Sequence, residues 1–139
     1  MLPGHTVGDV DVGVGDRGAV LVVVTDDDTA LALGSGALPV LGTPRLLAWC
    51  EAATCRALDG RLPAGSSSVG TSVRLEHLAP SVVGEQLGVV ALVASVESRR
   101  IGFDVEVTDA VGRVVGRGTV ERVVVDDERF LARLGGGTA

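Results

Sequence analysis

The sequence contains one strong helical pattern. One strand-like segment precedes it, and four more follow it along most of the remaining chain. The helical pattern covers residues 43–58, and the strand-like segments lie at 19–24, 69–78, 85–97, 101–108 and roughly 114–125. The run at 85–97 is apolar on both faces, which is typical of a central strand or of one covered by a partner subunit. The order predicts an α+β fold: one long helix packed on an antiparallel sheet of about five strands, the last four forming a meander.

The side chains available for a core are mostly aliphatic. The chain has 139 residues and is rich in valine, but it has only two Phe, one Trp and no Tyr. β-Branched side chains favour a sheet over a helical bundle, and this length corresponds to one ordinary domain. We therefore predict a single domain over residues 1–139. Its tail, DDERFLARL, is expected to form one or two helical turns before a disordered end at about 135–139.

Charge and cysteine content argue against several classes of function. The net charge of −6 repels a phosphate backbone, so we predict no nucleic-acid partner. The sequence shows neither a membrane-spanning run nor a signal-peptide pattern, so we also predict no membrane partner. Cys50 and Cys55 are five positions apart in the helical pattern, so their side chains diverge too far for an unstrained disulfide. Free thiols are expected in the reducing cytoplasm, where we place the protein.

Familiar cofactor and metal motifs are not met. The glycine-rich segment 13–18 has the spacing of a dinucleotide-binding turn, but a strand follows it where that mechanism needs a helix. Two His and two non-adjacent Cys do not make a zinc ligand set. We therefore predict neither a cofactor nor a metal.

The helix has a clear start signal. Thr43 is expected at the N-cap and Pro44 at the first helical position, and Asp59–Gly60 ends the helix. Residues 25–42, before the helix, are interpreted as a loop. A loop of this length in a small domain is more often functional than idle.

Three polar residues allow both a structural and a catalytic interpretation. The N-cap alone explains Thr43. Glu51 falls on the helical stripe of Cys55 and Leu58, where a carboxylate needs a partner, although a partly exposed Glu at a stripe's edge is common. His77 faces inward by strand alternation, as a structural histidine also would. An inward acid and an inward imidazole converge on one layer, which favours a functional site.

Several segments, taken together, resemble a known family. They are Gly42–Thr43, Trp49–Ala52, Gly65–Ser66, Val69–Thr71, His77, Ser95–Glu97, Arg99–Arg100, Gly118–Thr119 and Glu121–Arg122. They are similar to the fluoroacetyl-CoA thioesterase family of hotdog-fold proteins, from about residue 40 to Phe130. The resemblance implies a hotdog fold and a homodimer with substrate at the subunit interface. It also implies catalytic roles for Thr43, Glu51 and His77, and an active-site glycine at Gly70.

The implied activity is hydrolysis of an acyl-CoA or acyl-carrier-protein thioester. Glu51 would act as base or nucleophile toward the acyl carbonyl, and His77 would carry the proton. Thr43 would position Glu51, water or the acyl group. Backbone N–H groups near Gly70 and Thr71 would bind the oxyanion, and Arg122 is a further candidate for the site.

One departure concerns the substrate. The fluoroacetyl-specific member carries phenylalanines before its catalytic threonine, whereas this chain has Leu33–Leu38 (LGSGAL) there. Small residues cannot supply the tight contact that recognises one fluorine, so we predict that the site is not specific for fluoroacetyl. The alternatives are a non-catalytic acyl-thioester binding protein and an enoyl-thioester hydratase, although TPRLLAW lacks the Asp and His that a hydratase places there.

Geometry raises a question about the predicted site. On a straight helix, Thr43 and Glu51 lie about 12 Å apart along the axis, too far for direct contact. Either the segment carrying Thr43 folds back before the helix begins, or the catalytic groups meet across a dimer. We favour a contribution from the second subunit.

Overall fold

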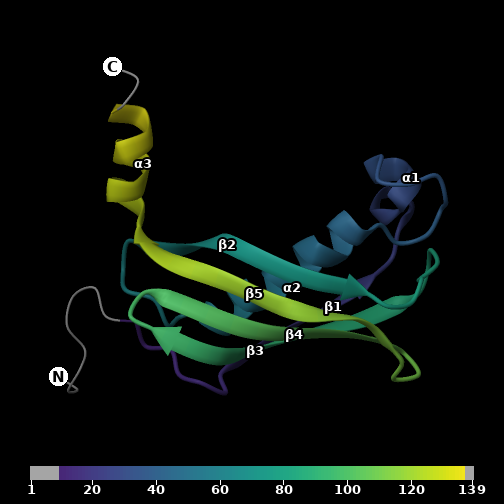
Figure 1. Cartoon of the computed structure of the whole chain (residues 1–139), viewed down its shortest axis with the longest axis horizontal. Coiled ribbons are helices and arrows are strands. Elements are labelled where there is room, and N and C mark those ends of the chain that lie inside the picture. The colour runs from purple at the N-terminus through teal and green to yellow at the C-terminus, as the bar shows by residue number, and fades with distance from the viewer. Residues whose placement is uncertain (1–9, 137–139) are drawn as a thin grey trace.

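A computed structural model of the chain describes residues 10–136 (Figure 1). Its elements are β1 (Arg17–Val23), η1 (Asp26–Asp28), α1 (Ala30–Leu33), α2 (Thr43–Leu58), β2 (Ser66–His77), β3 (Gln86–Glu97), β4 (Arg100–Asp109), β5 (Val114–Asp126) and α3 (Asp127–Gly136). The five strands form one antiparallel sheet, and α2 lies against one face of it (Figure 1). The predicted α+β class, with one long helix on a five-stranded antiparallel sheet, is confirmed.

The strand order is β1-β3-β4-β5-β2, so the predicted meander of the last four strands is wrong. β3, β4 and β5 are consecutive hairpins with short turns. β2 pairs instead with β5, from Ser66 opposite Asp126 to His77 opposite Gly116. The connection at 78–85 is longer than a tight hairpin turn, so it can carry the chain across to β3 on the far side of β5 and β4. β1 and β2 therefore form the two edges of the sheet.

α2 packs on the sheet through a stripe one position away from the predicted one. Its buried residues are Leu46, Cys50, Ala53, Thr54, Ala57 and Leu58. Glu51 therefore lies at the edge of the buried stripe rather than within it, and Cys55 is exposed. The core is aliphatic, as predicted, with Phe103 as its largest fully buried side chain.

α2 and β1 approach each other closely at Gly18. A Cβ atom added at Gly18 would lie 2.8 Å from the Cα atom of Ala57, inside van der Waals contact with the helix backbone. Glycine permits this approach because it has no Cβ atom. The backbone of β1 therefore packs directly against the backbone of the C-terminal half of α2.

The segment before α2 is predicted as loop but contains η1 and α1. The hydroxyl and the backbone N–H of Thr25 each donate to Asp28 Oδ2 at 2.8 Å. Arg45, on α2, forms an ion pair with the other carboxylate oxygen of Asp28 at 2.9 Å. These local bonds order a segment that its glycines and proline predict to be irregular, and they tie it to the helix. The N-cap of α2 is Gly42, so the prediction of Thr43 as N-cap is wrong.

The C-terminal helix is longer than predicted. α3 continues through Gly136, and most of the end predicted to be disordered, at about 135–139, lies outside the described residues. Figure 1 shows α3 standing away from the sheet beyond the end of β5. Within residues 10–136, the helices are too short or too polar to cross a membrane.

Candidate active site

Thr43 and His77 meet at one end of the sheet. The Thr43 hydroxyl lies 2.8 Å from His77 Nδ1, at hydrogen-bonding distance. The hydroxyl is available because Gly42, and not Thr43, caps the helix. His77 ends β2 and faces the helix layer, as its alternation predicts. The two residues line a shallow pocket of about 350 Å³ with α1 residue Ala30 and with the segment after β2.

The environment of His77 favours a neutral imidazole. Burial lowers the pKa of His77 below its ordinary value of 6.5, and an interaction with the backbone of Ala79 partly offsets that shift. His77 Nε2 is buried and has no hydrogen-bond partner within the described part of the chain. When Nε2 carries the proton, the Thr43 hydroxyl donates to Nδ1. This nitrogen can then receive or return a proton through Thr43.

Glu51 lies in a second cluster, halfway along α2. Arg122 Nη1 donates to Glu51 Oε2 at 3.2 Å. The arginine side chain is only 9% exposed, whereas that of Glu51 is 34% exposed. Ser68 fixes the guanidinium, because Nε donates to its hydroxyl at 2.8 Å and Nη2 donates to its carbonyl oxygen at 3.1 Å. A buried cation thus holds a carboxylate that remains open to solvent on its other side.

Gly70 lies directly beneath this carboxylate. A Cβ atom at position 70 would overlap Glu51 Oε2 and would lie 3.5 Å from Arg122 Nη1. A side chain at this position would therefore displace the carboxylate. The predicted role of Gly70 as a site residue is consistent with this contact, which depends on close backbone approach.

By strand alternation Thr71 falls on the same side as His77, which is predicted to face inward, but in the structure Thr71 does not face the core. The register of β2 with β5 shifts between Gly70 and Ser72, so Thr71 is the extra residue of a β-bulge. Its side chain is exposed, and its hydroxyl donates to the carbonyl oxygen of Glu121 at 3.2 Å. The bulge bends the edge strand next to Glu51, which is where an oxyanion contact is predicted.

The two clusters remain separate within one chain. α2 is continuous from Thr43 to Leu58, so the segment carrying Thr43 does not fold back over the helix. Thr43 and Glu51 are thus about 12 Å apart along the axis, as the straight-helix argument predicts. Of the candidates, the structure joins Thr43 to His77, and Glu51 to Arg122 and Gly70. Ser68 is the site residue that sequence reasoning missed, because a serine in a serine-rich strand carries no distinctive pattern.

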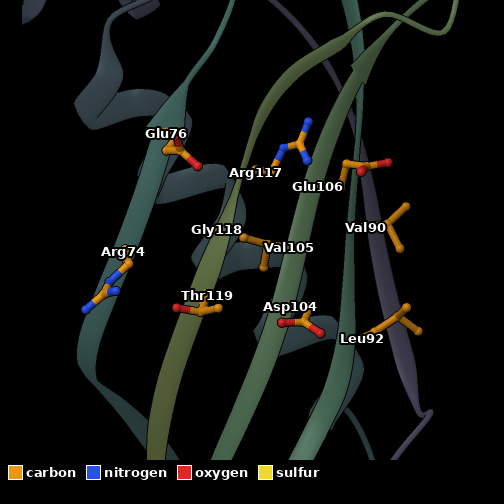
Figure 2. A pocket seen from close by; sticks show the side chains of 10 residues that line it. All are labelled: Arg74, Glu76, Val90, Leu92, Asp104, Val105, Glu106, Arg117, Gly118 and Thr119. Carbon is orange, nitrogen blue, oxygen red and sulfur yellow. The ribbon is translucent and has the colours of Figure 1, made fainter.

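A larger hollow of about 590 Å³ lies on the opposite face of the sheet (Figure 2). It is lined by outward-facing charged residues of both signs, such as Arg74, Glu106 and Arg117, and by apolar Val90 and Leu92. The sheet separates it from α2, so it shares no side chain with the Thr43 or the Glu51 cluster. The chemistry described above therefore does not extend to this hollow.

Cys50 precedes Glu51 but points into the core. Burial, and secondarily the charge of Glu51, raise the pKa of its thiol to about 11. Both Cys50 and Cys55 are free, in agreement with the sequence prediction that they do not pair. Neither thiol takes part in the clusters described above.

The fold and the site together define a class, the hotdog-fold thioesterases. The model of the fluoroacetyl-CoA-specific thioesterase family matches residues 24–128. A fluoroacetyl-CoA thioesterase from Streptantibioticus cattleyicolor is 35% identical over 95 residues, which are 68% of each chain. The chain belongs to the fluoroacetyl-CoA-specific thioesterase family, and the predicted class of reaction, thioester hydrolysis, is confirmed.

Solved structures agree with this assignment. A threonine-to-serine variant of a fluoroacetyl-CoA thioesterase in complex with acetyl-CoA has a TM-score of 0.84 and 30% identity, covering 92% of this chain and all of that one. A thioesterase superfamily member from Thermus thermophilus has a TM-score of 0.85 and 25% identity, covering 91% of this chain and 93% of that one. The fold is therefore shared over nearly the whole described chain.

Proposed function

We propose that this protein hydrolyses acyl-CoA thioesters using Glu51, and that its substrate is not restricted to fluoroacetyl-CoA. The observation that carries the proposal is the Glu51 carboxylate, which a buried arginine fixes at 3.2 Å while a third of its side chain stays exposed. Catalytic carboxylates need this combination of fixed position and access to substrate. Similarity to a fluoroacetyl-CoA thioesterase structure with bound acetyl-CoA supports a coenzyme A thioester as substrate.

The reaction adds water across the C–S bond. An oxygen nucleophile attacks the acyl carbon, the C–S bond breaks, and the thiol leaves with a proton, giving a free acid and coenzyme A. Glu51 either removes the proton of the attacking water or attacks the carbonyl itself. His77, bonded to Thr43, carries the proton, and backbone N–H groups at Gly70 and Thr71 stabilise the oxyanion. This route needs no cofactor besides the thioester.

A homodimer would place a second Thr43–His77 pair, that of the partner subunit, near Glu51. β2 is an edge strand, so a second copy can pair with it antiparallel about a two-fold axis. Full overlap of two β2 strands places Gly70 opposite the partner's Val73. The partner's His77 is then four residues along the strand from that point, roughly 13 Å, whereas His77 of the same chain is seven residues away, roughly 23 Å. The partner's His77 is then about as far from Gly70 as Thr43 of the same chain is from Glu51 along α2, so the pairing allows a site that both subunits share.

The segment before α2 bears on which acyl group the site accepts. The segment 33–38 has no aromatic side chain, and Leu33 and Leu38 are exposed. A site of this kind suits a larger apolar acyl chain better than fluoroacetate, on coenzyme A or on a carrier protein. An enoyl hydratase is disfavoured because the first turn of α2 carries no acidic residue. A cytoplasmic location stays a prediction from the two free thiols.

The test of this function is thiol release from a panel of acyl-CoAs, from acetyl and fluoroacetyl to long and aromatic chains. We expect hydrolysis across several acyl groups, with fluoroacetyl-CoA at no advantage of more than about tenfold in kcat/KM over the best alternative. A large preference for fluoroacetyl-CoA would contradict the specificity proposal. Tight binding of acyl-CoA without thiol release would favour the non-catalytic alternative.

The pH dependence tests the role of His77. Because burial lowers its pKa, the imidazole is neutral at pH 7 and gains a proton only as the pH falls below 6.5. We expect kcat/KM to stay constant as the pH is lowered to 6.5 and to decline below it. The NMR signal of the His77 imidazole, identified by its absence from the spectrum of His77→Gln, should titrate over the same pH range. An NMR midpoint at or above 6.5 would contradict the lowered pKa of His77. An unchanged acid limb in His77→Gln would remove His77 from the proton transfer.

A further inference from the structure

The C-terminal helix presents an apolar face that its own chain does not cover. Leu134 lies four positions after Phe130 and three after Leu131, so the three side chains share one side of α3. Leu131 is 64% exposed and Leu134 is 60% exposed. The same helix also carries charged residues, so its surface is amphipathic. The family match ends at residue 128, so this helix lies almost entirely outside it.

The first turn of α3 is fixed to the beginning of β2. The backbone N–H of Asp127 donates to the Gly65 carbonyl at 2.9 Å, and the Ser67 hydroxyl donates to the Asp127 carboxylate. These bonds set the direction in which the helix leaves the sheet. In Figure 1, α3 rises past the β2 edge at one end of that strand.

A second apolar surface lies at the other end of β2. Its residues, which we call the His77-end patch, are Leu31 (59% exposed), Leu38 (66%), Leu78 (47%) and Val82 (55%). Leu78 follows His77 directly and lines the pocket that contains Thr43. Figure 1 shows α1, next to this patch, rising past the same edge as α3 but at the opposite end of the strand.

Antiparallel pairing of two β2 edges would join these surfaces. In such a pair, the start of each strand lies beside the end of the other. α3 of one subunit then reaches the His77-end patch of its partner, and the two-fold axis repeats the contact. We propose that α3 packs its apolar face on the partner's His77-end patch and forms one wall of the pocket that contains the partner's Thr43 and the partner's His77. The inference rests on the dimer of the proposed function and adds a contact between α3 of one subunit and the partner subunit.

Crosslinking of variants that carry one exposed cysteine, with Cys50 left buried in the core, tests the contact without reference to activity. The full chain with Cys55→Ser serves as the background. Two variants are made in it, one with Leu134→Cys and one with Leu78→Cys. They are co-expressed with different tags and treated with a short bismaleimide crosslinker. We expect a crosslinked dimer from the mixed pair and from neither variant alone, because two copies of one position lie at opposite ends of the interface. Val14→Cys, 71% exposed beside the far edge strand β1, replaces Leu78→Cys as the matched control and should not crosslink.

A disruptive variant gives a second measurement. Leu131→Glu with Leu134→Glu should raise the dimer dissociation constant at least about tenfold, because two apolar side chains lose their burial. Its matched control, Arg129→Glu with Arg133→Glu, should change that constant less. A mixed pair that fails to crosslink while light scattering shows a dimer would overturn the α3 contact and leave the proposed function standing. A monomer would overturn both the contact and the shared site, whereas a crosslinked dimer without thiol release would overturn the proposed function alone.

Discussion

Replacing Glu51 by Gln is expected to reduce kcat for acyl-CoA hydrolysis by roughly 10²- to 10⁴-fold. The amide has nearly the same shape as the carboxylate, and its oxygen can still accept the hydrogen bond that Arg122 donates at 3.2 Å. It can neither attack a carbonyl nor take a proton from water. We therefore expect a folded protein that binds acyl-CoA but does not turn it over, as measured by thiol release and by calorimetric titration.

The matched control for this variant is Glu76→Gln. Glu76 lies on the exposed side of β2, one residue from His77, and lines the hollow on the opposite face of the sheet (Figure 2). The same loss of one negative charge there should leave kcat within about twofold. If Glu51→Gln keeps its turnover, the carboxylate is not the reacting group, and its contact with Arg122 serves the fold alone.

Replacing Gly70 by Ala is expected to lower kcat about 100-fold with little change in stability. The new Cβ atom overlaps Glu51 Oε2, which is the free end of a flexible side chain and can move aside. The movement shifts the carboxylate away from Arg122 and from the bulge at Thr71, so the reacting oxygen is misplaced by an ångström or more. Thiol release and the thermal midpoint, measured on the same preparation, separate the two effects.

Gly88→Ala is the control for a glycine in a strand of the same sheet. There the nearest atom to an added Cβ is Thr108 Oγ1 at 3.8 Å, an ordinary contact, so both activity and the thermal midpoint should hold. If Gly70→Ala is as active as the parent, then Glu51 tolerates displacement, and its position is not what limits the rate. A fall in the midpoint of more than about 10 °C would instead mean that the strand itself had been disrupted.

The sequence predicts the layers of this fold better than the order of its strands. Period-two alternation and one helical pattern predict which segments form the strands and which forms the helix, because those patterns are local. The pairing of β2 with β5 depends on where the 78–85 connection crosses, which no local pattern encodes. The ordering of residues 25–42 depends similarly on the contacts of Asp28 with Thr25 and Arg45.

The candidate site was predictable to a comparable degree. The segments that resemble the family predict Thr43, Glu51, His77, Gly70 and Arg122, and the structure joins them into two clusters. Helical spacing placed Glu51 on the core stripe, whereas a shift of one position puts it at the edge, open to solvent. Alternation also failed at Thr71, because a bulge reverses the direction of side chains along a strand. Single-residue shifts of this kind arise from tertiary packing, and the hydrophobic periodicity of the sequence does not predict them.

The buried thiol next to the catalytic candidate has a consequence for selectivity. A thiolate near an activated acyl group would capture it by exchange and leave the protein acylated on itself. With a pKa of about 11, roughly one Cys50 thiol in ten thousand is ionised at pH 7. Burial in the core also turns the sulfur away from the face where Glu51 meets solvent. The helix can therefore carry a cysteine beside the proposed catalytic carboxylate without that thiol competing with water for the acyl group.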